Sequence, residues 1–122
     1  MASPPVPQRL TRRAEFLRVA AKGRKAPAPG LVLQALARED AGPVRVGFTV
    51  TRKVGNAVVR NHARRRLRAA ARQVLAERPL AGVDLVLIGR EGTLRRPFAD
   101  LLADIRRTLA RTGAEAGAGA HA

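Results

Sequence analysis

Between Arg52 and Ala76 the chain carries a dense set of cationic side chains and no acidic one. The eight cations are Arg52, Lys53, Arg60, Arg64, Arg65, Arg66, Arg68 and Arg72. A guanidinium group presents a planar fork of donors that matches the oxygens of a phosphate, and its hydrogen bonds to phosphate are charge-assisted. The chemistry that this segment offers is therefore recognition of a polyanion.

An amphipathic helix predicted from Asn56 to about Glu77 positions most of these cations. Asn56 is a favoured N-cap residue, and Pro79 stops the helix just beyond its end. At 100° per residue, five arginines fall within an arc of about 140°, and an apolar stripe occupies a separate side. The arc holds Arg60, Arg64, Arg65, Arg68 and Arg72, and the stripe holds Val59, Ala63, Leu67, Ala70 and Val74. Arg66 lies outside the arc, and we expect its aliphatic stem to border the core.

The charge pattern of this helix disfavours folding of the helix alone. Like charges at i and i+4 destabilise a helix by about 0.2–0.5 kcal/mol per pair, and positions 60–64, 64–68 and 68–72 form such pairs without a compensating Glu. A plain solvated face normally mixes both signs, so we interpret the arc as a phosphate-binding surface. A basic amphipathic helix can also lie on a membrane, but that needs bulky apolar anchors, and this stripe holds Val, Ala and Leu.

The turn Arg52–Asn56, which leads into the helix, has two interpretations. Gly55 lets a backbone approach closely, and the free N–H groups of a helix start favour an anion. A plain capping turn explains the same residues equally well.

The composition also indicates a polyanionic partner. The chain has 122 residues, which suits one domain, and a net charge of +15. Only three of its 24 cationic residues are lysine, which fits bidentate phosphate recognition and fits a genome-wide arginine bias equally well. No apolar run approaches the ~20 residues that span a bilayer, and there is no cysteine for a disulfide or a thiolate metal site. We expect a cytoplasmic protein without a membrane partner.

The sequence offers no catalytic constellation. A polypeptide that itself cleaves a nucleic acid needs paired histidines for acid–base chemistry or clustered carboxylates for metal ions. Of the two histidines, His62 lies in the basic helix and the other lies next to the C-terminal residue. Asp100 and Asp104 share one helix face, but Arg96 and Arg107 flank them, so we expect ion pairing there. No cofactor is expected on the polypeptide itself.

The hydrophobic pattern predicts an α/β fold, an α+β sandwich in which helices pack on a small mixed sheet. We expect a helix over 11–21 with Thr11 as its N-cap, and strands over 31–37 and 44–51 that form a hairpin across the turn 40–43. The apolar run 83–88 is typical of a central strand. A last helix over 93–111 has Pro97 in its first turn and Phe98 in its apolar stripe, so Phe98 is expected in the core.

The predicted element order is α-β-β-α-β-α, with one more short strand near 24–29. These elements form a single domain over residues 9–112. A proline-containing arm over 1–8 and a Gly/Ala tail over 113–122 flank it, and both are expected to be disordered.

The run from Thr51 to Arg68 resembles the signature of the bacterial ribonuclease P protein subunit. That family has a helix with an Arg-Asn-Arg core, preceded by Lys-Lys/Arg-x-Gly-Asn-Ala-Val, and this chain reads TRKVGNAVVRNHARRRLR. The similarity extends to Arg9-Leu10, Glu15-Phe16, Gly23, Val46-Gly47-Phe48 and the terminal helix. It covers nearly the whole predicted domain.

The resemblance implies an accessory protein subunit of the enzyme that removes the 5′ leader from precursor tRNA, with an RNA subunit as catalyst and Mg²⁺ acting in the RNA holoenzyme. The implied partners are ribonuclease P RNA and precursor tRNA. It also implies a left-handed crossover through the basic helix, whereas the general rule favours a right-handed one. The positions matched to contacts with the catalytic RNA are Arg52, Lys53, Asn56, Arg60, Asn61, His62, Arg64, Arg65 and Arg68. The positions matched to a leader-binding cleft are Arg12, Arg13, Phe16, Lys22, Leu31, Leu33 and Phe48, of which Phe48 fits the core as well.

This sequence departs from the family pattern in its helix and in its aromatic residues. His62 stands where the motif usually has its second arginine, so one charge is lost. Ala20, Leu31 and Gln34 occupy cleft positions that are often aromatic in the family. Base stacking on an aromatic side chain is worth about 1–3 kcal/mol, so we expect leader binding to depend more on charge here.

Two other function classes stay open from the residues. One is a ribosomal-type structural RNA-binding protein. The other is a DNA-binding regulator that places the basic helix in a groove, although no helix-turn-helix partner is adjacent.

Overall fold

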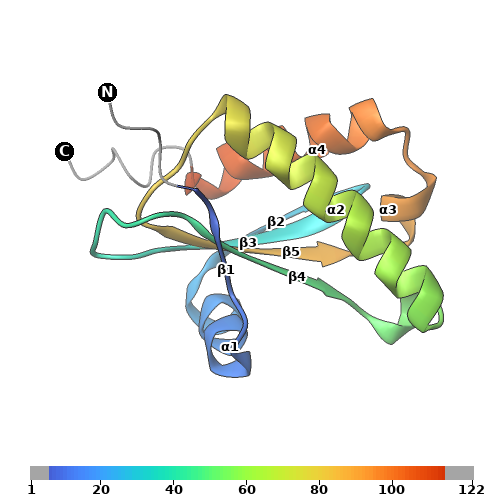
Figure 1. Ribbon diagram of the computed structural model, residues 1–122, viewed down its shortest axis with the longest axis horizontal. Coiled ribbons are helices and arrows are strands. Elements are labelled where there is room, and N and C mark those ends of the chain that lie inside the picture. Colours follow the sequence, from blue (N-terminus) through green and yellow to red (C-terminus); the bar gives the residue numbers. More distant parts are fainter. Residues whose placement is uncertain (1–5, 115–122) are drawn as a thin grey trace.

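Five strands form one mixed sheet, and helices lie on both of its faces (Figure 1). The computed structural model describes residues 6–114. In chain order the elements are β1 (Gln8–Arg9), α1 (Arg13–Lys22), β2 (Arg24–Ala28), β3 (Leu31–Ala37), β4 (Arg45–Val50), the 3-10 turn η1 (Arg52–Val54), α2 (Ala57–Glu77), β5 (Val83–Gly89), α3 (Glu91–Arg95) and α4 (Phe98–Thr112). The predicted fold class is confirmed, and so is the short extra strand, which is β2.

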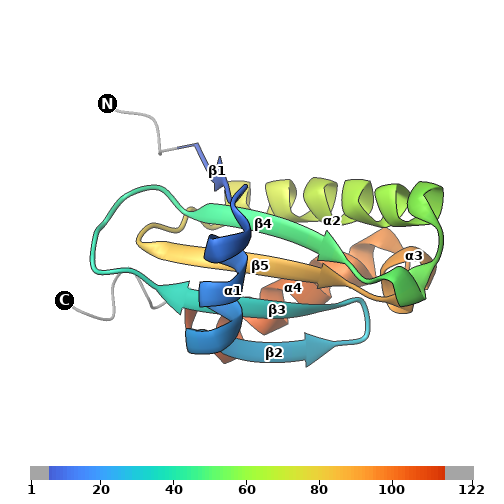
Figure 2. The same cartoon turned by 90° about the horizontal axis from the view of Figure 1, so that it is seen from below.

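The strand order across the sheet is β1-β4-β5-β3-β2, with β5 in the centre (Figure 2). β5 pairs antiparallel with β3 and parallel with β4, so the predicted hairpin of β3 with β4 is wrong. The reason is that Val83–Leu87 of β5 are buried throughout, and such a strand is covered on both faces and flanked on both edges. The segment between β3 and β4 instead crosses the start of β5, where the Arg38 N–H donates to the Gly82 carbonyl at 2.7 Å.

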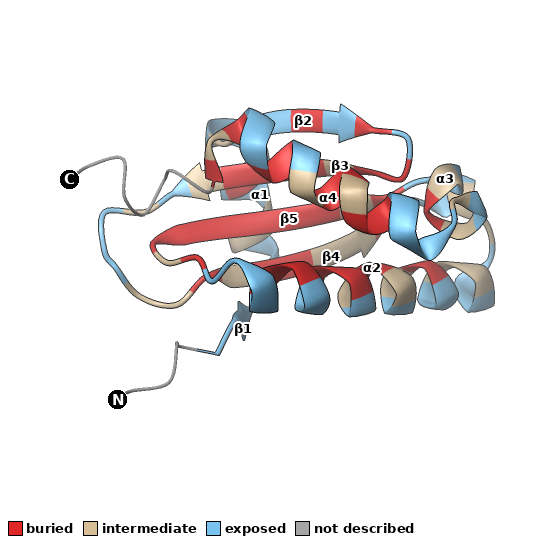
Figure 3. Ribbon diagram, turned by 90° about the horizontal axis from the view of Figure 1, so that it is seen from above, coloured by how far each residue is buried: buried red, intermediate tan, exposed pale blue. Residues whose placement is uncertain are grey.

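The crossover from β4 through α2 to β5 is left-handed. In Figure 3, α2 lies in front of the sheet, and β4 and β5 run in the same direction. When the figure is turned so that this direction points upward, β5 lies to the left of β4. This is the hand that the family resemblance implied and the opposite of the general rule for parallel connections.

Helices α2 and α4 cover one face of the sheet, and α1 crosses the other (Figures 1 and 2). The main core lies under α2 and α4 and includes Leu31, Leu33, Leu67, Val74, Leu85, Leu87, Leu101, Ile105 and Leu109. A smaller cluster lies under α1 and contains Leu10, Val19 and Val86, with Phe16, Leu36 and Ile88 packed against it. The two faces of the sheet therefore carry different residue sets, which alternate along each strand.

The helix ends follow local capping chemistry, with two corrections. The N-cap of α1 is Arg12 and not Thr11, because the Glu15 carboxylate accepts a hydrogen bond from the Arg12 N–H at 3.1 Å. The expected last helix is two helices, α3 and α4. Pro97 separates them because the residue before a proline is held in an extended conformation, as Arg96 is here at φ −69° and ψ 138°.

The edges of the domain differ slightly from the expected boundaries. Gln8, expected in the arm, pairs with Arg45 in the sheet, and Gly113, expected in the tail, is the C-cap of α4. The rest of the expected arm and tail falls largely on residues 1–5 and 115–122, outside the described residues. Within residues 6–114, no helix has the length and apolar character needed to cross a bilayer.

Candidate nucleic-acid interface

Helix α2 turns its arginines outward and its apolar stripe toward the sheet, as its periodicity predicts. Ala63, Leu67, Ala70 and Val74 are buried, and the side chains of the arc are half-buried or exposed. The helix begins at its predicted cap, where the Asn56 side chain accepts a hydrogen bond from the Val59 N–H at 3.0 Å. We use the term basic face for the exposed or half-buried cations of this helix and the preceding turn other than Arg66: Arg52, Lys53, Arg60, Arg64, Arg65, Arg68 and Arg72.

No carboxylate neutralises the basic face within the described part of the chain. The ion pairs of residues 6–114 lie elsewhere, in a cluster around Asp84, in a cluster around Asp104 and between Arg106 and Glu77. Arg64 donates to the amide oxygen of Asn61 at 2.7 Å, which is a neutral partner. The mutual repulsion along α2 therefore persists in the folded protein, which is expected where function rather than folding selects the residues.

Two arginines of α2 also pack against aromatic rings. The Arg68 guanidinium lies over Phe48 of β4, with 5.7 Å between its carbon and the ring centroid. Arg66 lies over Phe98 at 5.8 Å and donates to the Arg96 carbonyl, so it joins α2 to the linker between α3 and α4. Arg66 is half-buried, and its contacts are with the α3–α4 linker and Phe98. Phe98 is 37% exposed, which corrects its expected place in the core.

The turn before α2 is a capping turn whose glycine is required by packing. A Cβ on Gly55 would lie 2.8 Å from a methyl carbon of Val59, so a larger residue would collide with the first turn of the helix. Arg52 and Lys53 are exposed on this turn, next to the start of α2. Asn61 and His62 are exposed further along the helix. The positions matched to catalytic-RNA contacts are therefore all exposed or half-buried on α2 and the turn before it.

On the opposite face of the sheet, α1 places Phe16 directly over β4. A Cβ on Gly47 would lie 2.5 Å from two ring carbons of Phe16, so this glycine makes room for the ring. Arg12, Arg13 and Lys22 are exposed on or beside α1. These four predicted cleft residues thus lie on or beside one helix, with Lys22 at the end opposite to Arg12 and Arg13.

The other three predicted cleft residues lie on the far side of the sheet, and their assignment to the same cleft is wrong. Leu31 and Leu33 are fully buried in the main core, and Phe48 packs against that core under Arg68. Side chains alternate across a strand, so a shift of one residue changes the face. The neighbours that share the face of Phe16 are Val32 and Gln34 of β3, Gly47 and Thr49 of β4, and Ile88 of β5. The strict alternation of β4 could have revealed this once one residue of that face was known.

A chain of ion pairs holds α1 on the sheet. Glu15 of α1 binds Arg45 of β4 at 2.7 Å, and Arg45 and Arg38 both bind Asp84 of β5 at 2.7 Å. Burial alone would raise the pKa of Asp84, but the hydrogen bonds and charges of Arg45 and Arg38 outweigh it and lower the pKa below its usual range. A backbone hydrogen bond from Arg12 lowers the pKa of Glu15. Both carboxylates are thus charged at neutral pH, and sequence reasoning did not identify this cluster.

Comparison with known proteins identifies the family. The ribonuclease P family profile matches residues 5–113. This chain belongs to that family. It is 68% identical over 105 residues to the ribonuclease P protein component of Gluconacetobacter diazotrophicus, covering 86% of this chain and 90% of the relative. It is 54% identical over 110 residues to that of Paramagnetospirillum magneticum, covering 87% and 83%.

Solved ribonuclease P proteins have the same fold. The structure of the Thermotoga maritima protein superposes with a TM-score of 0.71 at 27% identity and covers 85% of this chain and 96% of that one. The Staphylococcus aureus protein gives the same TM-score at 20% identity, covering 87% and 95%. The role of this family is 5′ processing of precursor tRNA, and a ribonuclease P component has an RNA partner. The alternatives of a ribosomal-type protein and a DNA-binding regulator are therefore set aside.

Proposed function

We propose that this protein is an accessory subunit of ribonuclease P, in which the RNA subunit performs the cleavage and the basic face of α2 binds that RNA. The observation that carries the proposal is the set of seven exposed or half-buried cations of the basic face, none of which has a carboxylate partner in the described residues. Because the chain belongs to the ribonuclease P family, the RNA subunit is the polyanion that we expect to bind this surface.

The state of the acidic residues supports the assignment of the chemistry to RNA. Asp104, the best carboxylate candidate for a metal site by sequence, is fully buried and bound by Arg96 at 2.9 Å and by Arg107. It also accepts a hydrogen bond from the Gly30 N–H at 2.9 Å. This carboxylate is committed to joining α4 to the β2–β3 turn. In the proposal, Mg²⁺ belongs to the RNA and the polypeptide binds no cofactor.

The face of the sheet that carries α1 is the proposed contact for the 5′ leader of precursor tRNA. Arg12, Arg13 and Lys22 supply exposed charge, and Phe16 supplies a ring at the junction of α1 and β4. Because Phe16 is half-buried against Gly47, charge rather than stacking is expected to dominate there. Processing of tRNA precursors also supports a cytoplasmic location.

Reconstitution tests the proposed function. Purified protein is added to ribonuclease P RNA at a magnesium concentration at which the RNA alone is slow, and cleavage of precursor tRNA is measured. The protein should accelerate cleavage, and the double variant Arg64→Ala/Arg65→Ala should accelerate it much less.

The matched control is Arg106→Ala/Arg111→Ala, which removes the same charge from α4. It should behave as wild type. Cleavage by the protein without RNA would overturn the proposal, and so would equal stimulation by the two double variants.

A further inference from the structure

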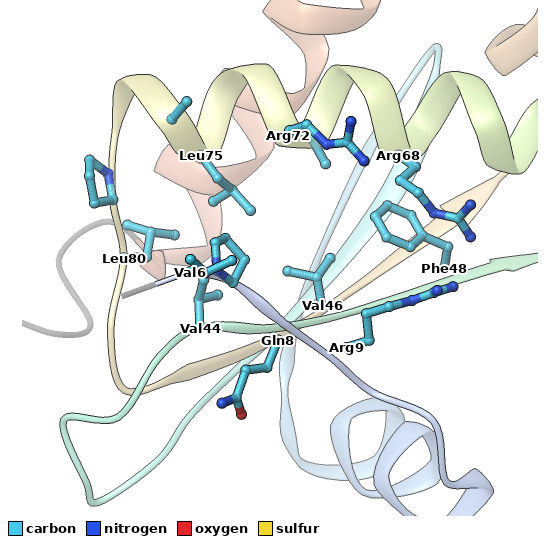
Figure 4. Close-up of a pocket in the computed structure, with 14 residues that line it drawn as sticks. Val6, Gln8, Arg9, Val44, Val46, Phe48, Arg68, Arg72, Leu75 and Leu80 are labelled. Carbon is cyan, nitrogen blue, oxygen red and sulfur yellow. The ribbon is translucent and has the colours of Figure 1, made fainter. Parts of the chain in front are cut away.

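A groove of about 570 Å³ lies between the C-terminal half of α2 and the edge formed by β1 and β4 (Figure 4). It is on the face of the sheet opposite α1, so it is separate from the proposed leader contact. Its size is within the range of pockets that hold small organic ligands. It is continuous with the basic face, because Arg68 and Arg72 line it.

The two ends of the groove differ in chemistry. One end is apolar and is lined by Val6, Val44, Leu75, Leu80 and neighbouring small side chains. At the other end, Arg9 of β1 and Arg68 of α2 approach the ring of Phe48, and the Arg72 guanidinium extends toward Arg68 (Figure 4). An apolar slot beside three guanidinium groups fits a ligand that has a flat uncharged part and an anionic part.

The cations of the groove have capacity left for a ligand. Within the described residues, none of Arg9, Arg68 and Arg72 has a carboxylate partner. The Nε of Arg68 is buried and has no hydrogen-bond acceptor among those residues. The Nε atoms of Arg60 and Arg66, outside the groove, are in the same state, so a ligand in the groove would contact the terminal nitrogens of its arginines, which no carboxylate of the described residues binds.

We propose that the groove holds one unpaired nucleotide of ribonuclease P RNA. Its base lies against Val46, Leu75 and the ring of Phe48, and its phosphates lie toward Arg9, Arg68 and Arg72. Single-stranded RNA is recognised in this manner, by stacking of a splayed base on an aromatic ring or guanidinium plane beside cations that bind the backbone. This inference rests on the proposed function, since it assigns the occupant to the RNA that binds the basic face.

The test is the variant Phe48→Leu, with Phe98→Leu as its matched control. Both phenylalanines lie under an arginine of α2, but only Phe48 lines the groove. Affinity for ribonuclease P RNA is measured across a salt series, and the protein-bound RNA is probed with a reagent that modifies unpaired bases. Phe48→Leu should weaken binding at least fivefold, leave the salt slope unchanged because no phosphate contact is lost, and expose one base that wild type protects. Phe98→Leu should stay within twofold.

A second variant tests the groove independently, in case Phe48→Leu does not fold. Ala76 is exposed and lines the apolar end, so Ala76→Leu should narrow the groove and also weaken binding at least fivefold. The same exchange at the exposed Ala110 of α4 is its control.

Wild-type affinity for Phe48→Leu with an unchanged melting temperature would overturn the inference, as would wild-type affinity for Ala76→Leu. An effect confined to the leader of precursor tRNA, or to a peptide partner, would also overturn it. If wild type binds ribonuclease P RNA no more tightly than unrelated RNA of the same length, the proposed function itself fails, and the groove inference fails with it.

Discussion

Removal of one charge from the basic face should change the salt dependence of RNA binding by a predictable amount. Each phosphate contact contributes about −0.7 to −0.9 to the slope of log affinity against log salt concentration. If all seven cations contact phosphates, the slope is about −5 to −6, and affinity falls by roughly 10³- to 10⁴-fold between 50 and 200 mM salt. Arg65→Ala should reduce the steepness by about 0.7–0.9, which corresponds to a loss of about five- to eightfold at 0.1 M salt when the two affinities are equal at about 1 M.

The assay is the equilibrium affinity for ribonuclease P RNA at several salt concentrations. Arg106→Ala serves as the control because it removes the same charge from an arginine that is already paired with Glu77, at 2.9 Å. Its slope should equal that of wild type. A flat salt profile for wild type would refute the reasoning, and an equal change in both variants would show that net charge matters and the position on α2 does not.

Three further predictions concern the face of the sheet that carries α1. Asp84→Asn leaves Arg38 and Arg45 without their shared charge, so the free energy of unfolding in urea at pH 7 should fall by about 2–4 kcal/mol. Because the pKa of Asp84 is lowered in the folded state, its contribution to stability is present above its unfolded pKa and is lost as the pH falls from that value through the folded pKa. Wild type should therefore lose more stability between pH 7 and pH 3 than Asp84→Asn. An equal loss in both proteins would contradict the assignment. Gly47→Ala pushes a methyl group into the Phe16 ring and should destabilise the protein by about 1–3 kcal/mol, measured by the same urea titration; wild-type stability would mean that α1 shifts freely. Phe16→Ala should weaken holoenzyme affinity for precursors with long leaders and spare mature tRNA ends, and equal effects on both substrates would remove Phe16 from the leader contact.

Local features of the chain were predictable because they depend on near neighbours in the sequence. The Asn56 cap and the outward arc of α2 follow from helix geometry and charge spacing alone. The ranges of β3 and β5 follow from short apolar runs. The exceptions were small: Arg12 replaced Thr11 as the N-cap of α1, and Pro97 divided the last helix.

The composition and spacing of the sequence thus determined what the protein binds, a polyanion, and which helix presents the charge. Only the tertiary structure decided which strands are neighbours, on which face Leu33 and Phe48 lie, and that Arg9 of β1 meets Arg68 of α2 across a groove. Hydrophobic periodicity shows that a side chain is buried but not against which partner, since the two faces of a strand differ by a single residue of register. The pairing of β4 with β5, which sets that register, joins segments more than thirty residues apart and depends on how the whole core packs.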